Sequence, residues 1–310
     1  MKKTSLLLLS SSMLMLLSCG GGGSQTIPEG KKVQKEDLAT HYAAAKENTD
    51  KVDALSVAVK GGFLFENYSK ATMGETSQEI GGKIEVKDFY LNAGIKNFRE
   101  DVTKFQTSLT FGAGFEYRNG IGDNAVSATA NIKKAGFYIE DGMGYMDMES
   151  VRPIIQSLLP TAELPSTLHF KNPAEIPADV AKILDIDGML TQLETNFTAG
   201  VDYLDCGKGN YSFVYNLDPT KIIGETGSTS VEAKGSAAFA VSFSDEGFTS
   251  LGLFADFEAS VKADAATGDM VVKSETTVKL KVDLKADFAY GDQAVIESVP
   301  NPDSFPDLPE

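Results

Sequence analysis

A long run of alternating apolar and charged side chains near the C-terminal end constrains the fold more than any other feature of this sequence. Within residues 278–288 the sequence interleaves Val278, Leu280, Val282, Leu284, Ala286 and Phe288 with Lys279, Lys281, Asp283, Lys285 and Asp287. Successive side chains of a β-strand point to opposite faces of the sheet. The run therefore predicts a strand with one buried face and one face in water.

Further strand-like segments, most of them bounded by Gly, Asn or Asp, occur along the chain. They are residues 54–68, 81–95, 105–117, 125–134, 211–217, 230–244 and 251–263, ahead of a last segment at 270–289. The triplet Glu140-Asp141-Gly142 separates two short apolar segments and predicts a hairpin turn. We therefore expect a large antiparallel sheet.

Helical patterns interrupt these strands. Lys35–Asn48 lacks Gly and Pro and places Leu38, Tyr42 and Ala45 on one helical face. Ser150 is suited to cap a helix that stops at Pro160. A second helix is predicted over residues 176–195, and a short one from Asp218-Pro219 to Ile223. We expect the two helices between Ser150 and Thr195 to cover the apolar face of the sheet.

The first residues have the order of a secretory signal. Lys2 and Lys3 precede an apolar run of about a dozen residues, shorter than the roughly 20 that a spanning helix needs. The closing residues Leu16-Leu17-Ser18-Cys19 resemble a bacterial lipobox, and this resemblance implies cleavage before Cys19 and lipidation (palmitate included) of its sulfur. The alternative is an ordinary signal-peptide cysteine. Gly20 follows rather than Asp, so an inner-membrane retention signal is absent, and the choice between inner and outer membrane stays open.

These features predict four segments: a lipoprotein signal peptide at 1–18, a flexible Gly/Ser-rich spacer at 19–34, a single domain at 35–305 and a tail at 306–310. The folded part is expected outside the cytoplasm, in the bacterial cell envelope. Once residues 1–18 are removed, the 28 basic residues, less Lys2 and Lys3, and the 44 acidic residues leave a formal charge of −18. Such a surface repels nucleic acid and anionic lipid headgroups. We therefore expect no nucleic-acid partner, and we expect the lipid on Cys19 to anchor the protein to the membrane.

The residues of common catalytic and metal sites do not come together in the sequence. His41 and His169, the only two histidines, lack metal-ligand spacing. Cys206 is the only cysteine besides Cys19 and fits a packed thiol better than a nucleophile. Asp185-Ile-Asp187-Gly188 lacks the remaining ligands of a calcium loop. The sequence therefore predicts no enzyme, no metal and no cofactor, although an acid/base hydrolase built from its many carboxylates stays an open class.

The order of helix, strands, two helices, short helix and terminal strands resembles the LolA-like superfamily of half-barrel lipoproteins, which includes the LppX and LprG group. Two segments carry this resemblance locally, Phe239–Phe248 as a hairpin and Phe288–Ile296 followed by Pro300 as a strand ending. The resemblance implies an α+β fold in which a curved antiparallel sheet, a half-barrel, is covered by amphipathic helices around an apolar cavity that carries lipid or lipoprotein acyl chains.

The sequence thus leaves two functions open: a tethered carrier of an apolar ligand, or a structural or protein-interaction lipoprotein whose core is filled by its own side chains. Core and cavity residues have the same chemistry, so periodicity does not separate the two. The candidate lining residues are Phe63, Phe65, Leu109, Phe111, Phe115, Ile155, Leu159, Ile183, Leu184, Phe257 and Phe288.

Overall fold

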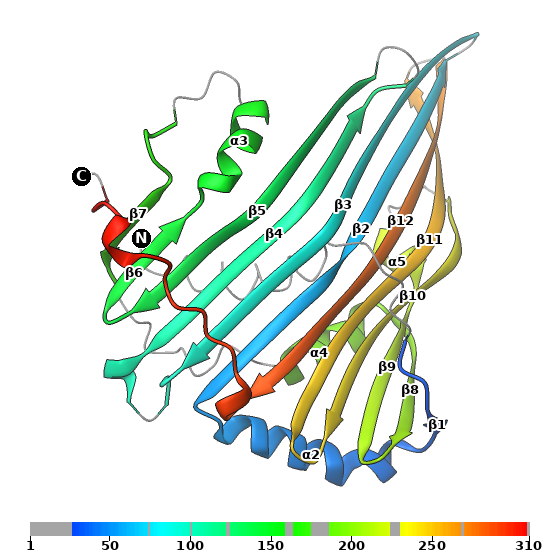
Figure 1. Ribbon diagram of the computed structural model, residues 1–310. Coiled ribbons are helices and arrows are strands. Elements are labelled where there is room, and N and C mark those ends of the chain that lie inside the picture. Colours follow the sequence, from blue (N-terminus) through cyan, green and yellow to red (C-terminus); the bar gives the residue numbers. More distant parts are fainter. Residues whose placement is uncertain are drawn as a thin grey trace.

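The computed structural model describes residues 27–73, 75–99, 101–121, 125–158, 164–174, 186–223, 230–267 and 270–308. They form one antiparallel sheet in the order β1-β8-β9-β10-β11-β12-β2-β3-β4-β5-β6-β7 (Figure 1). The strands are β1 (Lys31–Lys32), β2 (Ala54–Met73), β3 (Thr76–Lys96), β4 (Gln106–Asn119), β5 (Val126–Glu140), β6 (Met143–Asp147), β7 (His169–Pro173), β8 (Thr198–Gly207), β9 (Asn210–Leu217), β10 (Ser230–Ser244), β11 (Gly247–Thr267) and β12 (Met270–Tyr290). The large antiparallel sheet expected from the sequence is therefore present.

The described helices are α2 (Lys35–Lys51), α3 (Arg152–Leu158), α4 (Ile186–Asn196) and α5 (Pro219–Ile223). The expected helix from Ser150 is present as the 3-10 turn Glu149–Val151 followed by α3. Its predicted end at Leu159 and Pro160, and the part of the predicted second helix before Ile186, lie outside the described residues. The hairpin at Glu140–Gly142 is confirmed, because Asp141 and Gly142 both take the positive φ that a tight two-residue turn requires.

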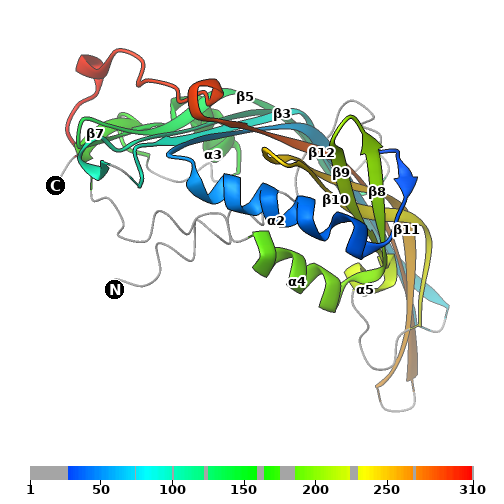
Figure 2. The same cartoon turned by 90° about the horizontal axis from the view of Figure 1, so that it is seen from below.

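The two faces of the sheet differ in chemistry. Register places the alternating apolar residues of β2, β4, β11 and β12 on one face, called here the apolar face, where they pack into the main core. The opposite polar face carries ion pairs between neighbouring strands, such as Lys281 Nζ to Asp256 Oδ2 at 2.9 Å. Figure 2 shows α2 and α4 on one side of the sheet and the C-terminal segment on the other.

The expectation of a half-barrel covered by amphipathic helices is wrong. The sheet is open, with β1 and β7 at opposite edges, and the described helices are few and short. β2, β3, β11 and β12 have 20 or 21 residues each, which at the strand rise is about 65 Å. The longest of these helices, α2, has 17 residues and is about 25 Å long. The helices described here are therefore too short to cover such strands.

Helix contacts are concentrated at one side of the sheet. α2 and α5 contact β10 and β11, and α4 contacts β8. Tyr42 of α2 packs its ring against Phe213, Phe243 and Phe248. This corner of the apolar face is a filled core, with Val241 and Phe243 fully buried.

The C-terminal segment, residues 291–308, crosses the polar face and is called here the strap (red in Figure 1). The Val295 and Glu297 amides donate to the hydroxyls of Ser56 and Ser108, at 2.9 Å each. At its end the strap pairs with the outer edge of β7, where the Lys171 amide donates to the Pro306 carbonyl at 2.8 Å. At the other edge of the sheet Lys31 and Lys32, within the predicted spacer, pair with β8.

Candidate functional site

The apolar face continues beyond the filled core into side chains that remain exposed. Five large apolar residues at the far ends of β2, β3, β4 and β5 form this surface, called here the open patch. They are Met73, Ile80, Ile84, Tyr117 and Val126, with 48%, 58%, 39%, 37% and 67% of their surface exposed. Register places all five on the same face as the core.

Cross-strand pairs connect the core to the open patch without a break. Val86, which is buried, pairs with Phe63 on one side and Phe115 on the other. One step further along the strands, Ile84 stands between Phe65 and Tyr117. Neighbouring strands lie about 4.8 Å apart, so the apolar row from Leu280 through Phe65, Ile84 and Tyr117 to Ala128 is about 20 Å long.

The structure brings most of the predicted lining residues onto this face. Phe63, Phe65, Leu109, Phe111, Phe115 and Phe288 are half-buried there, whereas Phe257 is buried in the core with 2% exposure. Ile155 lies half-buried on α3, away from this row. Leu159, Ile183, Leu184 and the predicted lipidation site Cys19 lie outside the described residues.

Sequence reasoning missed the residues of the open patch. The face of the sheet on which they lie could be predicted from the sequence, because Ile80, Ile84 and Val86 are spaced by even numbers of residues, as Phe63 and Phe65 are. The exposure of these side chains could not be predicted, because it depends on how far the helices extend along the strands. Such exposure separates candidate ligand contacts from core residues of the same chemistry.

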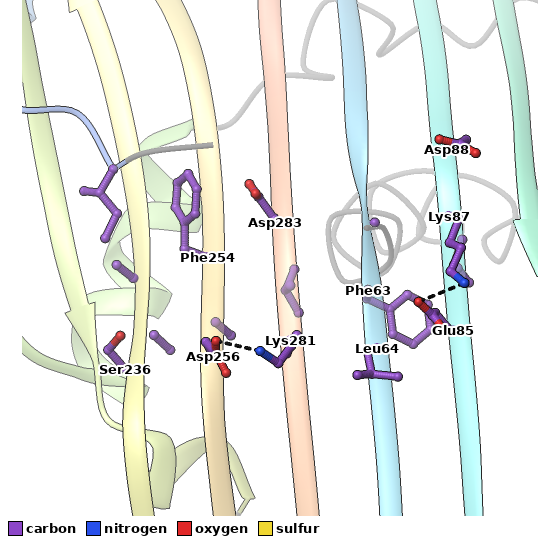
Figure 3. Close-up of a pocket in the computed structure, with 17 residues that line it drawn as sticks. Phe63, Leu64, Glu85, Lys87, Asp88, Ser236, Phe254, Asp256, Lys281 and Asp283 are labelled. Carbon is purple, nitrogen blue, oxygen red and sulfur yellow. Dashed lines mark hydrogen bonds and ion pairs between the residues drawn. The ribbon is translucent and has the colours of Figure 1, made fainter. Parts of the chain in front are cut away.

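A groove of about 560 Å³ lies on the opposite, polar face, lined by Ile27 and by residues of β2, β3, β10, β11 and β12 (Figure 3). Four of its labelled charged residues form two ion pairs, Lys281 with Asp256 at 2.9 Å and Lys87 with Glu85 at 3.2 Å (Figure 3). Hydrogen bonds from Lys83 lower the pKa of Glu85 and of Glu116, so both carboxylates stay ionised. The charged side chains of this groove form a solvated ion-pair network, and none of those described is positioned as a general acid or base.

Other reactive groups are held in structural contacts. Cys206 is half-buried in β8, and its thiol donates to the Ser212 hydroxyl at 3.5 Å. In the described part of the chain, His, Cys, Asp and Glu side chains do not gather into a group that could hold a metal ion. The helices of that part are also too short or too polar to cross a membrane.

No protein-family model matches the chain, and no curated protein matches it significantly. Among the solved structures that align with it, three have identities of 6% to 9%. A DUF1329 family protein from Desulfovibrio piger is 9% identical, covers 83% of this chain and 95% of its own, and gives a TM-score of 0.14. The secretin domain of InvG from the Salmonella SPI-1 injectisome is 6% identical, with 95% and 81% coverage and a TM-score of 0.14.

The outer membrane protein OprG from Pseudomonas aeruginosa is 8% identical, covers 78% of this chain and 99% of its own, and gives a TM-score of 0.10. All three scores are far below 0.5. These likenesses therefore carry no argument about fold or function, and the site has to be interpreted from its own geometry.

Proposed function

We propose that the protein is a membrane-tethered extracytoplasmic lipoprotein that binds an apolar ligand, a lipid or an acyl chain, on the apolar face of its sheet. The open patch is the observation that carries this proposal. Soluble proteins rarely leave large apolar side chains gathered on one surface unless that surface binds something. Here five of them continue an apolar core outward along four strands.

The dimensions of the row support an acyl chain. The hydrocarbon core of a bilayer is about 30 Å thick, so a lipid chain spans about 15 Å in one leaflet. The row from Leu280 to Ala128 is about 20 Å long, by the strand spacing. A chain lying across the strands would therefore contact the row along its whole length.

Tethering through Cys19 and a relation to the LolA-like superfamily belong to the same proposal. The lipobox-like Leu16-Leu17-Ser18-Cys19 supports the tether. A large antiparallel sheet with one apolar face supports the relation, whereas the helices of the described residues do not give that face the extensive cover that the superfamily has. The proposal accordingly places the ligand on an open face.

The test uses the chain from Gly20 onward, exported and purified without detergent. Organic extracts are analysed by mass spectrometry, and the protein is titrated with a fluorescent fatty acid. We expect bound lipid in the extract, and weaker binding of the probe by about tenfold or more in Ile84→Lys, because a charge replaces apolar contact area.

Tyr68→Lys is the matched control, because Tyr68 is similarly exposed at 40% but lies on the polar face of β2. It is expected to bind the probe like the unmodified chain. Clean extracts together with probe binding that Ile84→Lys leaves unchanged would overturn the proposal, and would favour a structural or protein-interaction lipoprotein.

A further inference from the structure

One edge of the sheet is open along part of β5. This strand pairs with β4 almost throughout, but with β6 only from Gly136 to Glu140. Over residues 126–132 its other edge has no strand partner in the parts of the chain that the structure describes. Beyond this stretch the edge is occupied, since the Ser150 hydroxyl donates to the Lys134 carbonyl at 2.5 Å and α3 begins nearby. Figure 1 shows β5 as the outer strand there.

Two other edges of the sheet carry features that discourage strand pairing. The strap covers β7. β10 pairs with β9 only from Ala237 onward, but its open stretch holds Glu232, Lys234 and a positive-φ Gly235. Charges and irregular backbone of this kind protect an exposed edge.

Residues 126–132 of β5 have neither protection. The sequence Val-Ser-Ala-Thr-Ala-Asn-Ile contains no charged residue, no proline and no glycine. Its backbone N–H and C=O groups on the open side therefore form a template for another strand. Such a template selects an extended partner whose side chains alternate in the same way.

We propose that this edge pairs antiparallel with the same edge of a second copy of the chain, centred on Thr129. In this register Val126 stands opposite Ile132, Ser127 opposite Asn131, and Ala128 opposite Ala130. Because side chains alternate, the apolar pairs all fall on the apolar face and the polar pairs on the polar face. Two-fold symmetry requires this self-complementarity of an edge.

Local charge also suits a second copy. The chain carries a net charge of −16, so two copies repel at long range, but residues 126–132 hold no acidic side chain. Lys133 would stand opposite Ala125, so the register sets no like charges directly against each other. Pairing would also cover Val126, the most exposed residue of the open patch.

Disulfide trapping tests the register. In the chain from Gly20 onward, which lacks Cys19, Cys206→Ser removes the remaining thiol and Thr129→Cys adds one at the centre. Opposed residues of antiparallel strands have Cα atoms about 4.5–5.5 Å apart, within the range of a disulfide. We expect covalent dimers on mild oxidation, and few from Glu232→Cys, the matched control on the open stretch of β10.

Sedimentation of the unmodified chain tests the interface itself. We expect a dimer, and a dissociation constant raised about tenfold by Thr129→Lys, which sets two lysines against each other. Circular dichroism checks that the fold is unchanged. A monomer at concentrations up to about 1 mM, where even a dissociation constant of that size would be detected, would overturn the proposal. A dimer indifferent to Thr129→Lys would also overturn it.

The proposal does not depend on lipid binding, because Thr129 lies on the polar face and Ile84 on the apolar face. We expect Thr129→Lys to bind the fatty-acid probe normally and Ile84→Lys to dimerise normally. Failure of one proposal is therefore distinguishable from failure of the other.

Discussion

Glu297 connects the strap to three strands through one partly buried carboxylate. Its Oε2 accepts from Lys134 Nζ at 2.6 Å, and its Oε1 accepts from the Thr110 hydroxyl at 2.8 Å and from Asn92 at 3.4 Å. Burial alone would raise the pKa of Glu297, but these hydrogen bonds together outweigh it and hold the pKa below its ordinary value. The ionised form is therefore the one that the fold stabilises.

Glu297→Gln is expected to lower the free energy of unfolding at pH 7 by about 1–2 kcal/mol, because hydrogen bonds to a charged group are lost. A folded pKa below the unfolded value of about 4.3 gives stability that is complete above pH 4.3 and is lost as the pH falls through the folded pKa. Urea unfolding between pH 7 and pH 3 should show a steeper loss in the unmodified chain than in the variant. Asp292→Asn, exposed on the same segment, is the control. Equal pH slopes for the two variants would contradict the assignment.

Phe257 and Phe65 have the same side chain in different surroundings on one face. Phe257 is 2% exposed, and truncation to Ala is expected to cost about 3–4 kcal/mol. Phe65 is half-buried beside the open patch, so Phe65→Ala should cost about 1 kcal/mol. Thermal unfolding measures the loss of stability in each variant. Fatty-acid titration should show weaker binding by Phe65→Ala, which is expected to remain folded. A Phe65→Ala variant as unstable as Phe257→Ala would make Phe65 a core residue.

At the scale of elements, the strap end closes the β7 edge through Phe305. Its ring is 2% exposed, stacks on His169 with centroids 3.6 Å apart, and meets Tyr145 edge-on at 5.3 Å. Phe305→Ala is expected to cost about 3 kcal/mol, and hydrogen exchange should report faster amides in β6 and β7. Leu308→Ala, 47% exposed on the same segment, should leave both measurements unchanged. Protection that survives in β7 would mean that the strap does not hold this edge.

Most of the long strands could be predicted from the sequence, whereas β7 and β8 could not. β12 was predicted to within one residue because its apolar and charged residues alternate cleanly. β10 was predicted with its observed bounds because it holds a continuous apolar run, Ala237–Val241, which is buried on both faces. β8 was missed because Tyr203 and Leu204 are both apolar and pack on opposite faces, into two separate clusters. β7 was missed because it lies in a proline-rich stretch and takes its pairing from β6 and the strap.

At the scale of the whole molecule, the common face of Phe63, Phe65, Leu109 and Phe115 could be predicted from alternation, but the extent of its cover could not. Cover depends on where a helix of about 25 Å sits along strands of about 65 Å, a long-range property that local patterns do not encode. The same difference in length leaves Ile80 and Met73 exposed at the strand ends.

The chain as a whole is expected to be held at a membrane by the lipid on Cys19, because the formal charge of −18 that remains without residues 1–18 works against electrostatic attachment to anionic lipid. One acyl chain binds only marginally, and stable anchoring takes two. Cys19→Ser removes the only thiol of the lipobox-like segment. We expect the unmodified protein in the detergent phase of a phase partition, and any folded Cys19→Ser protein released from the signal in the aqueous phase outside the cytoplasm. Cys206→Ser should partition like the unmodified protein. A processed, lipid-bearing Cys19→Ser protein in the membrane fraction would show that the tether lies elsewhere.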